Sequence, residues 1–588
     1  MNNLEVADLL HNVAAAYKIK NEIKNKFKIV AYERAADAIE HLSSEVRDVW
    51  DEGNLKEVAG IGPSIADHLD EIFKTGKSKH FSAVLKGIPP SVFELLKVTG
   101  IGPKHAFKFA KELKITRGSD AIKKLKKAAM IGKIARLEGF SEDSQKSILA
   151  AVKEEEHKPK ARLLIDQAEI IAGQIIDWVN KDPNVVRVDA LGSLRRKAST
   201  VGDIDISASS KDPKITMDHF IKFPNATRVL EKGDRSGSIM LPGNIRADLM
   251  VETPDAYGAL LQHFTGSKHH NIAIRDMAIK KGWSVSDYGI YIGGKLQKLD
   301  TEEKLYKKLG LAYIPPEIRE DNGEIIAAKE NKIPKLIELD DIKGDLHMHT
   351  NFDIETSHDI GANSMEDMAL VAQNLGYEYI ALTEHNPGAS THNYKQINNI
   401  IKSKKEEVDK LNYSFEKYHE KRVFKIFNSL EIDIKTDGSL PVDDSGLELL
   451  DFALVSIHSS FRSNKKEMTK RILAALNHPK VKIFAHPTAR KLNERGSIDL
   501  DWPQIFDFCL KNNKWLEINA DPHRLDLPDF LVKDAIEQGV KLVISTDSHH
   551  KNSLANMKYG VYVARRGWAT KMNIANTRAL SDFEKMLN

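Results

Sequence analysis

Apolar and polar residues follow different patterns in three parts of the chain. From residue 1 to about 150, apolar residues recur at helical spacing between short turns that contain glycine, which predicts a set of small helices. From Val185 to about Ile314, short apolar runs alternate with helical stretches, which predicts a mixed α/β region. The segment 315–335 is polar, with proline near both ends, and we interpret it as a linker.

After this segment, seven apolar runs are each followed by a stretch of helical periodicity. The runs are IKGDLH, YIALTEH, VFKIFNSLEID, FALVSIH, VKIFAH, KWLEINA and VKLVISTDSH. Continuous apolar strands separated by helices are typical of parallel strands that are covered on both faces. This part of the chain is therefore predicted to form a barrel-like β/α domain.

The composition indicates a folded protein of several domains. A chain of 588 residues is too long for one hydrophobic core, and 41% hydrophobic with 29% charged residues is ordinary for a globular protein. The N-terminal residues have the pattern of an amphipathic helix rather than a signal peptide, and no apolar run is long enough to cross a bilayer. The single cysteine, Cys509, excludes disulfides within the chain. We therefore expect a cytoplasmic protein that does not bind membranes.

Two loops in the helical part share one pattern, an apolar residue between two glycines followed by proline. Glycines let the backbone approach closely, and the exposed amides of the following helix can bind a phosphate oxygen without reading a base. One such loop would be interpreted as a tight turn, but two copies resemble the helix-hairpin-helix motif and so favour binding to the DNA backbone. A basic stretch, 104–136, follows the second loop. The candidate DNA-binding residues are Gly60, Gly62, Gly100, Gly102 and Lys104.

Three acidic residues in the mixed region predict a metal-dependent reaction. Asp203 and Asp205 lie two residues apart, so that both can face one side of a strand, and Asp248 lies in another apolar run. Close carboxylates repel one another unless cations lie between them. Three of them suit two Mg²⁺ ions, which activate an attacking hydroxyl and neutralise a leaving pyrophosphate. The candidate triphosphate-binding residues beside them are Gly192, Ser193, Arg196 and Gly202.

Potential metal ligands end the strand-like runs of the C-terminal region. They are His347, His349, His385, Glu431, His458, His486, Asp547 and His549. A single histidine of this kind would be interpreted as structural, but the carboxyl ends of parallel strands open onto one face of a β/α barrel. The converging side chains suit two or three divalent ions, with Mn²⁺, Zn²⁺ and Fe²⁺ all reasonable. Metal-bound water can attack a phosphodiester, so we expect a hydrolytic reaction.

These motifs resemble those of the family X DNA polymerases. The two glycine loops resemble helix-hairpin-helix motifs, and LGSLRR with GDIDI resembles the nucleotidyltransferase superfamily. The run HFTGS and the residues after it resemble the family X region that contacts the incoming nucleotide and the template. This resemblance implies that the nucleotide-binding residues include Phe264, Gly266, Asn271 and Arg275. In the N-terminal domain, His68 and Ser64 stand where family members with lyase chemistry have lysines.

The C-terminal segments DLHMHT, TEHN, SLEID, SIHSS, AHPTAR and STDSH resemble the polymerase and histidinol phosphatase (PHP) domain. The resemblance implies a distorted seven-stranded β/α barrel and Mn²⁺-dependent 3′-5′ exonuclease activity. The usual SDG after the first histidines is replaced by NFDIETSHDIG, so the remaining ligand is His358, Asp359 or Asp353, with His358 preferred. Glu384 stands before His385, where the family usually has Asp.

The expected fold is multidomain α and α/β. The expected domains are 1–85, a helical lyase-like DNA-binding domain; 86–157, a second helix-hairpin-helix domain; 158–254, a nucleotidyltransferase palm; 255–316, a thumb; 317–340, a linker; and 341–588, a PHP barrel.

The resulting hypothesis is a family X DNA polymerase that fills short gaps during DNA repair and processes 3′ ends. It would use Mg²⁺ at the palm and Mn²⁺ or Zn²⁺ at the barrel, act on gapped or primed DNA with dNTPs, and work as a monomer. One alternative is a PHP phosphoesterase with a weak or vestigial polymerase. The other is a non-enzymatic scaffold that binds DNA ends.

Overall fold

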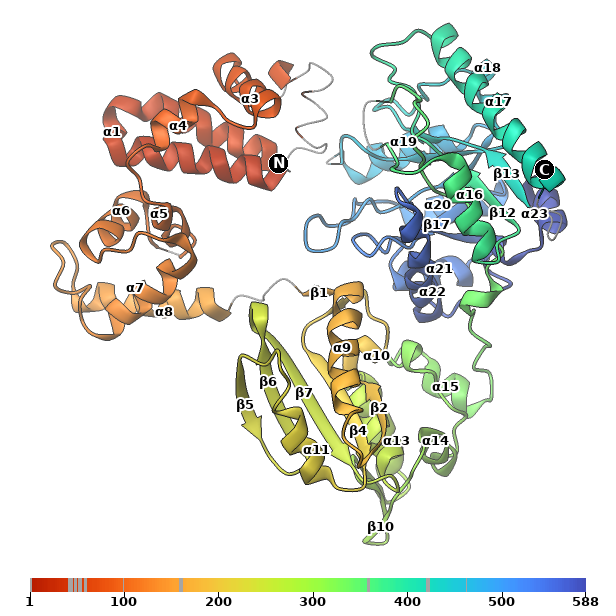
Figure 1. The fold of residues 1–588 in the computed structure, drawn as a ribbon, viewed down its shortest axis with the longest axis horizontal. Coiled ribbons are helices and arrows are strands. Elements are labelled where there is room, and N and C mark those ends of the chain that lie inside the picture. Colours follow the sequence, from red (N-terminus) through yellow and green to blue (C-terminus); the bar gives the residue numbers. More distant parts are fainter. Residues whose placement is uncertain are drawn as a thin grey trace. The chain divides into compact units, whose positions relative to one another are not determined.

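The computed structural model describes residues 3–40, 46, 50, 55–57, 61–98, 100–157, 162–356, 360–418, 424–461 and 463–587. The chain divides into two compact units. The first is Met1–Ala161 with His458–Ser463, and the second is Arg162–Ile457 with Asn464–Asn588. Figure 1 colours the elements along the chain.

The described part of residues 3–157 is helical, as the spacing of its apolar residues predicts. Its elements are α1 (Asn3–Glu40), η1 (Leu55–Glu57), α3 (Pro63–Thr75), α4 (Lys79–Leu85), α5 (Pro90–Leu95), α6 (Pro103–Glu112), η2 (Gly118–Asp120), α7 (Ala121–Met130) and α8 (Glu142–His157). Helix α1 is interrupted at Asn21, whose backbone is extended and whose side chain accepts a hydrogen bond from the Lys24 amide at 3.0 Å. Separate cores form around Leu69 and around Phe109.

The two glycine loops have matching backbones where they are described. Gly62 caps α3 with φ −75° and ψ 160°, and Gly102 caps α6 with φ −81° and ψ 168°. A proline opens each helix, and the apolar residue before each cap, Ile61 or Ile101, is buried. The repeat in the sequence is therefore a repeat in structure. Gly60 lies outside the described residues.

A five-stranded sheet forms the first part of the second unit. Its order is β2 (Val185–Ala190), β4 (Ile204–Ser210), β7 (Ile245–Glu252), β6 (Ser236–Leu241) and β5 (Arg228–Lys232). Strands β4 and β7 run parallel, and the other neighbours are antiparallel. Helices α9 (Ile165–Val179) and α11 (Pro213–Phe220) pack against the sheet. The short strands β1 (Leu163–Leu164) and β3 (Thr200–Val201) pair with each other.

The chain continues through a smaller α/β part. Its elements are α12 (Tyr257–Thr265), α13 (Lys268–Ile279), β8 (Trp283–Ser286), β9 (Gly289–Ile292), β10 (Lys295–Gln297), α14 (Glu302–Leu309), η4 (Pro316–Ile318) and α15 (Glu324–Lys329). One core cluster runs through it and includes Ile274, Leu305, Ile318 and Leu336.

The polar segment interpreted as a linker is folded into this core. Arg319 is fully buried, and its Nη1 lies 2.6 Å from Oε1 of Glu302. Glu324 is also fully buried, and its Oε1 lies 2.6 Å from Nδ1 of His270. A segment with the composition of a linker is therefore packed here, because its charges are neutralised by partners that local composition does not reveal.

The C-terminal β/α region, residues 344–587, contains a strand at each of the seven predicted runs. The strands are β11 (Gly344–Asp345), β12 (Tyr379–Leu382), β13 (Lys425–Asn428) with β14 (Glu431–Asp433), β15 (Ala453–Ser456), β16 (Val481–Phe484), β17 (Trp515–Asn519) and β18 (Leu542–Ser545). The pairings between these strands are parallel. A bridge between Met348 and Ser548 joins the segments that follow β11 and β18, and a bridge between His385 and Glu431 joins the segment that follows β12 to β14.

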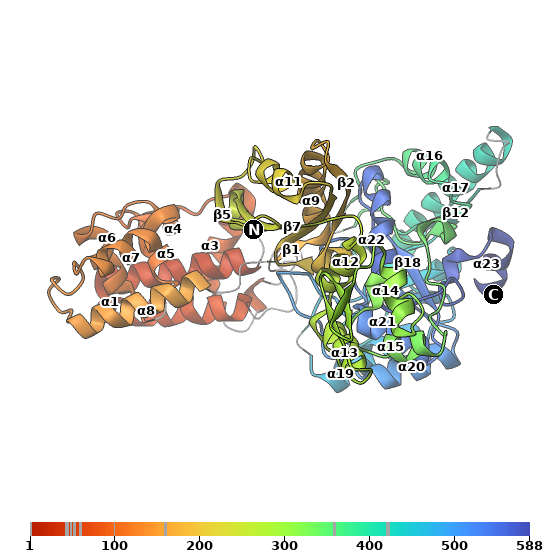
Figure 2. The same cartoon turned by 90° about the horizontal axis from the view of Figure 1, so that it is seen from below.

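Helices surround these strands, whose residues are almost all buried (Figures 1 and 2). The helices are α16 (Met365–Asn374), α17 (Tyr394–Tyr418), α18 (Asp444–Leu447), α19 (Lys465–Leu476), α20 (Trp502–Lys511), α21 (Asp529–Glu537), α22 (Met557–Arg566) and α23 (Leu580–Leu587). Burial on both faces explains why the strands have continuous apolar sequences. Among the described residues, no helix has the length and apolar character required to cross a membrane.

The buried pair of His270 and Glu324 gives a test of the folded segment. We expect Glu324→Ala to lower the free energy of unfolding by about 3 kcal/mol, because the substitution leaves a buried polar partner behind. The urea unfolding transition, followed by tryptophan fluorescence, measures this change. Glu330→Ala removes an exposed carboxylate close by and should leave the transition unchanged. Equal transitions for the two variants would contradict the assignment.

Candidate active sites

Two of the three predicted acids lie opposite each other on the central strands of the five-stranded sheet. Asp205 on β4 is the register partner of Asp248 on β7, and Asp203 is exposed immediately before β4. Burial, Asp248 and Asp203 together raise the pKa of Asp205 to about 6. Arg246 donates a hydrogen bond to Asp248 at 2.8 Å. Since the negative charges oppose one another here, the arrangement favours a bound cation.

Gly192 lies directly against these acids. Its φ is +55°, and a Cβ at this position would lie 2.4 Å from Oδ2 of Asp205. The amide of Leu191 donates to the Asp205 carbonyl at 2.8 Å. Glycine is therefore required by both the backbone conformation and the close approach. Ser193 follows in α10 (Gly192–Arg195) and is half-buried.

Arg196 connects this turn to the α12 and η4 segments. Its Nη1 donates to the carbonyl of Thr265 at 2.6 Å, and its Nε donates to Oε1 of Glu320 at 3.0 Å. Gly266 is adjacent and has a φ of +67°. A Cβ at this position would lie only 3.2 Å from Nη1 of Arg196. Gly202 is exposed beside Asp203. The structure thus gathers the predicted phosphate-binding residues around the acids.

The residues predicted to contact the nucleotide lie on α12 and α13. Asn271 donates to the His263 carbonyl at 2.6 Å and accepts from Gln262 at 2.9 Å, so its amide holds the end of α12. The ring of Phe264 meets that of His263 edge-on at 4.8 Å. Arg275 is exposed. Burial of His263 lowers the pKa of this histidine, and the positive charge of Arg275 also lowers it.

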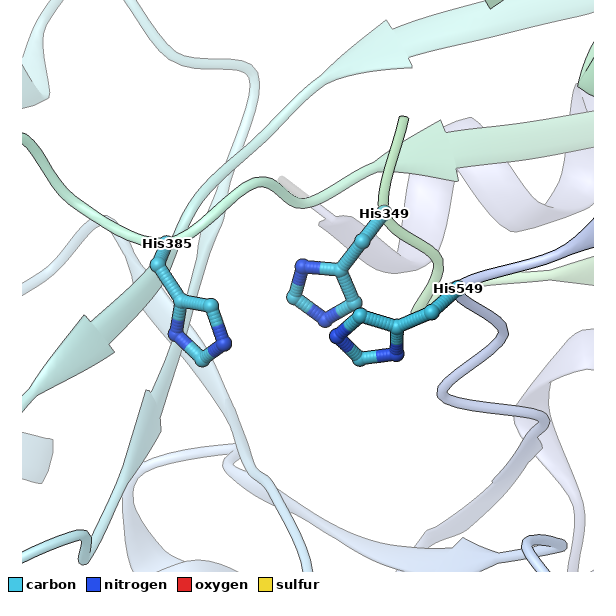
Figure 3. Close-up of side chains that lie close together, drawn as sticks. All are labelled: His349, His385 and His549. Atoms are coloured by element: carbon cyan, nitrogen blue, oxygen red, sulfur yellow. The ribbon is translucent and has the colours of Figure 1, made fainter. Parts of the chain in front are cut away.

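The predicted ligands of the C-terminal β/α region converge at the carboxyl ends of its strands. Three overlapping groups have all their ligand atoms within 4.8 Å of one another. They are His349, His385 and His549; His347, His349, Glu431 and Asp547; and His385, Glu431 and His458. Figure 3 shows the three histidines of the first group gathered around one space. Nε2 of His486 lies 2.8 Å from Oε1 of Glu431 and so adjoins the same centre.

The chemistry of these side chains fits divalent metal ions. Buried ring nitrogens of His347 (Nε2), His349 (both) and His549 (Nε2) have no hydrogen-bond partner among the described residues. Burial and the nearby His549 lower the pKa of His349 to about 4, so its ring is neutral at physiological pH. Neutral imidazoles beside carboxylates are suitable ligands for Mn²⁺, Zn²⁺ or Fe²⁺. Among the described residues, groups this compact occur only in this region, and the acids of the five-stranded sheet are spread more widely.

A second layer of polar side chains orients the ligands, and the sequence interpretation missed most of it. Oε1 of the fully buried Glu517 lies 2.7 Å from Nδ1 of His347, and its Oε2 accepts from the His486 amide at 2.7 Å. Asn519 donates to Asp547 at 3.0 Å. The sequence feature that could have indicated Glu517 is a carboxylate within the otherwise apolar strand KWLEINA. Such partners fix the ring orientation and raise ligand basicity.

Glu384, where the family usually has Asp, belongs to this layer. It accepts a hydrogen bond from Thr350 at 2.5 Å, and its Oε2 lies 2.7 Å from Nζ of the fully buried Lys404. The same lysine donates to the Leu382 carbonyl at 2.7 Å. Glu384 therefore supports the strand end that carries His385.

The additional ligand remains a prediction. His358 and Asp359 lie outside the described residues. Asp353 is exposed, accepts a hydrogen bond from the Glu355 amide at 3.2 Å, and is in none of the three compact groups.

A pocket of about 500 Å³ opens beside the ligand groups. Its lining is mainly polar and includes acidic and basic side chains. The lining residues are Ile360, Lys491, Glu494, Asp521, His523, Arg524, Asp547 and His549. Nε of Arg524 lies 3.5 Å from Oδ2 of Asp547, so a basic side chain of the pocket lies next to a predicted metal ligand. A phosphate group at this place would meet the basic side chains.

Comparison with known proteins identifies the family. A model of the DNA polymerase beta thumb matches residues 260–320, and a helix-hairpin-helix domain matches residues 1–78. The whole chain is 34% identical to the DNA polymerase/3'-5' exonuclease PolX of Bacillus subtilis, 99% of which it covers. The chain belongs to the family X DNA polymerases.

More distant members of the family match only part of the chain. DNA polymerase lambda of Rattus norvegicus is 23% identical over 54% of this chain and 56% of its own length. DNA polymerase lambda of Arabidopsis thaliana is 24% identical over 54% of this chain and 62% of its own length. As a member of family X related to PolX over its full length, the chain is an enzyme, a DNA polymerase with 3′-5′ exonuclease activity that requires divalent metal ions.

In the N-terminal region of this family X polymerase, two histidines pack together, and one of them is His68, at the position predicted to match a lyase lysine. The rings of His68 and His80 stack with centroids 4.1 Å apart, and the hydroxyl of Tyr17 lies 2.9 Å from Nε2 of His80. Ser64 is 3.4 Å from His68. An imidazole cannot form the Schiff base on which lyase chemistry depends.

The contact between Gly192 and Asp205 gives a test of the acid site. We expect Gly192→Ala to slow Mg²⁺-dependent nucleotide incorporation by about 100-fold, because the added methyl group displaces a carboxylate by more than an ångström. Steady-state primer extension measures this change. The matched control is Gly173→Ala in α9, where nothing lies within 4 Å of the new methyl group. If the two variants extend primers equally, Asp205 does not act in the reaction.

Proposed function

We propose that this polymerase fills short gaps in damaged DNA and trims 3′ ends at a second centre. The first reaction adds dNTPs to the primer on gapped or primed DNA with Mg²⁺ at Asp203, Asp205 and Asp248. The second hydrolyses the terminal phosphodiester with two or three Mn²⁺ or Zn²⁺ ions in the C-terminal β/α region. The observation that carries the first assignment is the opposition of Asp205 and Asp248 on parallel neighbouring strands.

In the synthetic reaction, the three carboxylates would hold the metal ions, which would lower the pKa of the primer hydroxyl and neutralise the leaving pyrophosphate. Gly192, Ser193, Arg196 and Gly202 would bind the triphosphate, which must lie in line with the primer terminus. The residues that would face the sugar, base and template are Phe264, Gly266, Asn271 and Arg275. Contacts to the triphosphate would orient the nucleotide without selecting its base.

The N-terminal region would bind the DNA backbone at its glycine loops. The cap residues Gly62 and Gly102 and the nearby Lys104 are exposed, and nothing lies within 4 Å of a Cβ at either glycine, which supports this role. Gly60 and Gly100 belong to the same proposal. Such contacts are electrostatic and independent of sequence, so binding should weaken steeply as the salt concentration rises.

In the hydrolytic reaction, the histidines at the strand ends would hold the metal ions together with Glu431 and Asp547, and His358 would complete the set. The bound ions would supply an activated water and neutralise charge on the phosphate. The nearby Lys491 and Arg524 would hold the phosphate of the terminal nucleotide. We propose the domain limits 1–85, 86–157, 158–254, 255–316, 317–340 and 341–588, with the last a PHP domain, and a monomer acting in the cytoplasm.

The synthetic assignment predicts a selective loss. We expect Asp203→Ala with Asp205→Ala to reduce primer extension at least about 100-fold, because the charge stabilisation of the transition state is lost. Hydrolysis of a 3′ end should persist in the same preparation. The control Asp218→Ala removes an acid on α11 that pairs with Lys232 at the surface. Extension by the double variant at the control rate would remove the basis of the assignment.

The hydrolytic assignment predicts the opposite loss. We expect His347→Ala with His349→Ala to reduce Mn²⁺-dependent 3′ degradation by more than about 100-fold, since even changes to second-layer partners reach that size. Bound Mn²⁺ per chain after dialysis, measured by elemental mass spectrometry, should fall with it. His478→Ala is the control, because this histidine precedes β16 at the opposite strand end and pairs with Asp444. Unchanged metal content and degradation in the double variant would refute the assignment.

A further inference from the structure

Arg566, the last residue of α22, connects the C-terminal β/α region with the turn that carries Arg196. Its guanidinium donates to Asp529 on α21 at 2.7 Å and to Oε1 of Glu320 at 3.0 Å. It also donates to the main-chain carbonyl of Arg196 at 2.8 Å. The side chain is only 11% exposed, so these three bonds hold it in one position.

The same carboxylate oxygen of Glu320 accepts hydrogen bonds from two arginines. Nε of Arg196 lies 3.0 Å from Glu320 Oε1, and so does Nη1 of Arg566. The Arg196 Nη1 is used by the Thr265 carbonyl at 2.6 Å. Arg566 thus contacts Arg196 twice, directly at its main chain and through Glu320 at its side chain.

The charges of this cluster are shared unequally between the two arginines. Within this cluster, Asp529 pairs with Arg566, whereas Glu320 pairs with both Arg196 and Arg566. One carboxylate shared between two cations neutralises Arg196 incompletely. Without Arg566, Glu320 would pair with Arg196 alone and compete with phosphate oxygens for its guanidinium.

The neighbouring residue provides a second connection to the same helix. Lys197 binds Glu169 at 2.9 Å, and the other oxygen of Glu169 binds Lys558 of α22 at 2.9 Å. The ammonium of Lys197 also lies 4.3 Å from the ring centroid of Tyr562 on α22. Two successive residues at the end of the α10 turn are therefore held by one helix of the C-terminal β/α region.

We infer that Arg566 is a positioning residue for the triphosphate site, so that α22 of the hydrolytic region forms a structural part of the polymerase centre. This inference rests on the proposed role of Arg196 in binding the triphosphate. Arg566 touches neither DNA nor the acids; it sets the direction and the residual charge of the residue that meets the phosphates.

The test is the steady-state kinetics of Arg566→Ala in the full-length protein. We expect KM for dNTP to rise about 10-fold while kcat falls less than about 3-fold, because the loss affects a contact made to the bound nucleotide before and during the reaction. The rate of 3′ degradation should be unchanged. Arg566→Lys keeps the charge at the interface and should recover part of the KM change, although it cannot make all three bonds of a guanidinium.

Arg565→Ala is the matched control. Arg565 is the adjacent residue on α22 and binds Glu317 at 2.8 Å and the Ile337 carbonyl at 2.8 Å, so it holds the same interface without contacting Arg196. An equal rise of KM in both variants would overturn the inference, because the effect would then belong to the interface as a whole. A wild-type KM for Arg566→Ala, or loss of both activities in the alanine and lysine variants alike, would overturn it as well.

A second measurement separates this inference from the proposed function. Arg196→Ala should raise KM for dNTP, and adding Arg566→Ala to it should raise KM no further, because both act on one contact. Fully additive effects would overturn the inference while leaving the polymerase assignment intact. If the wild-type protein does not extend primers, or if Asp203→Ala with Asp205→Ala still does, the proposed function itself is wrong.

Discussion

The parallel pairing of β4 with β7 brings Asp205 and Asp248 face to face, and much of the surrounding structure serves to maintain this costly arrangement. Two carboxylates at adjacent positions repel each other, and burial together with this repulsion raises the pKa of Asp205. The antiparallel strands on either side keep the register, and the turn at Gly192 closes against one of the acids with no space for a side chain. Because the fold holds these carboxylates close together, their repulsion favours the binding of a cation between them.

The C-terminal β/α region also holds potential metal ligands close together, but its ligands include histidines. Its imidazoles and carboxylates collect at strand ends, where the main chain of His486 and Asp547 adopts φ values of 29° and 53°. Such conformations are unfavourable for residues other than glycine and persist where the surrounding structure enforces them. Glu517 accepts a hydrogen bond from the His486 amide, and Asn519 donates one to Asp547, so both His486 and Asp547 are held by buried polar partners. The two centres therefore both depend on charged groups that folding holds in unfavourable surroundings.

The sequence predicted the parts of the structure that depend on local pattern. Seven apolar runs corresponded to the strands, and the helical N-terminal part and the multidomain α and α/β fold are confirmed. The convergence of the histidines followed from their common place after strands, while the roles of individual residues and the domain limits stay predictions. Glu517, Glu320 and Arg566 were missed because their partners are distant: Glu320 and Arg566 lie 246 positions apart. Likewise, the segment around Arg319 had the composition of a linker but is buried through ion pairs.

The ligands of the C-terminal centre are distributed over almost the whole length of its region, from His347 near the start to His549 near the end. During synthesis on the ribosome, the first histidines emerge long before β18 and the residues after it. The acids at 203, 205 and 248, by contrast, are all made before that region begins. A metal-ligand cluster assembled from the first and last strands is thus completed only when translation is nearly finished, so an incomplete nascent chain lacks part of this cluster.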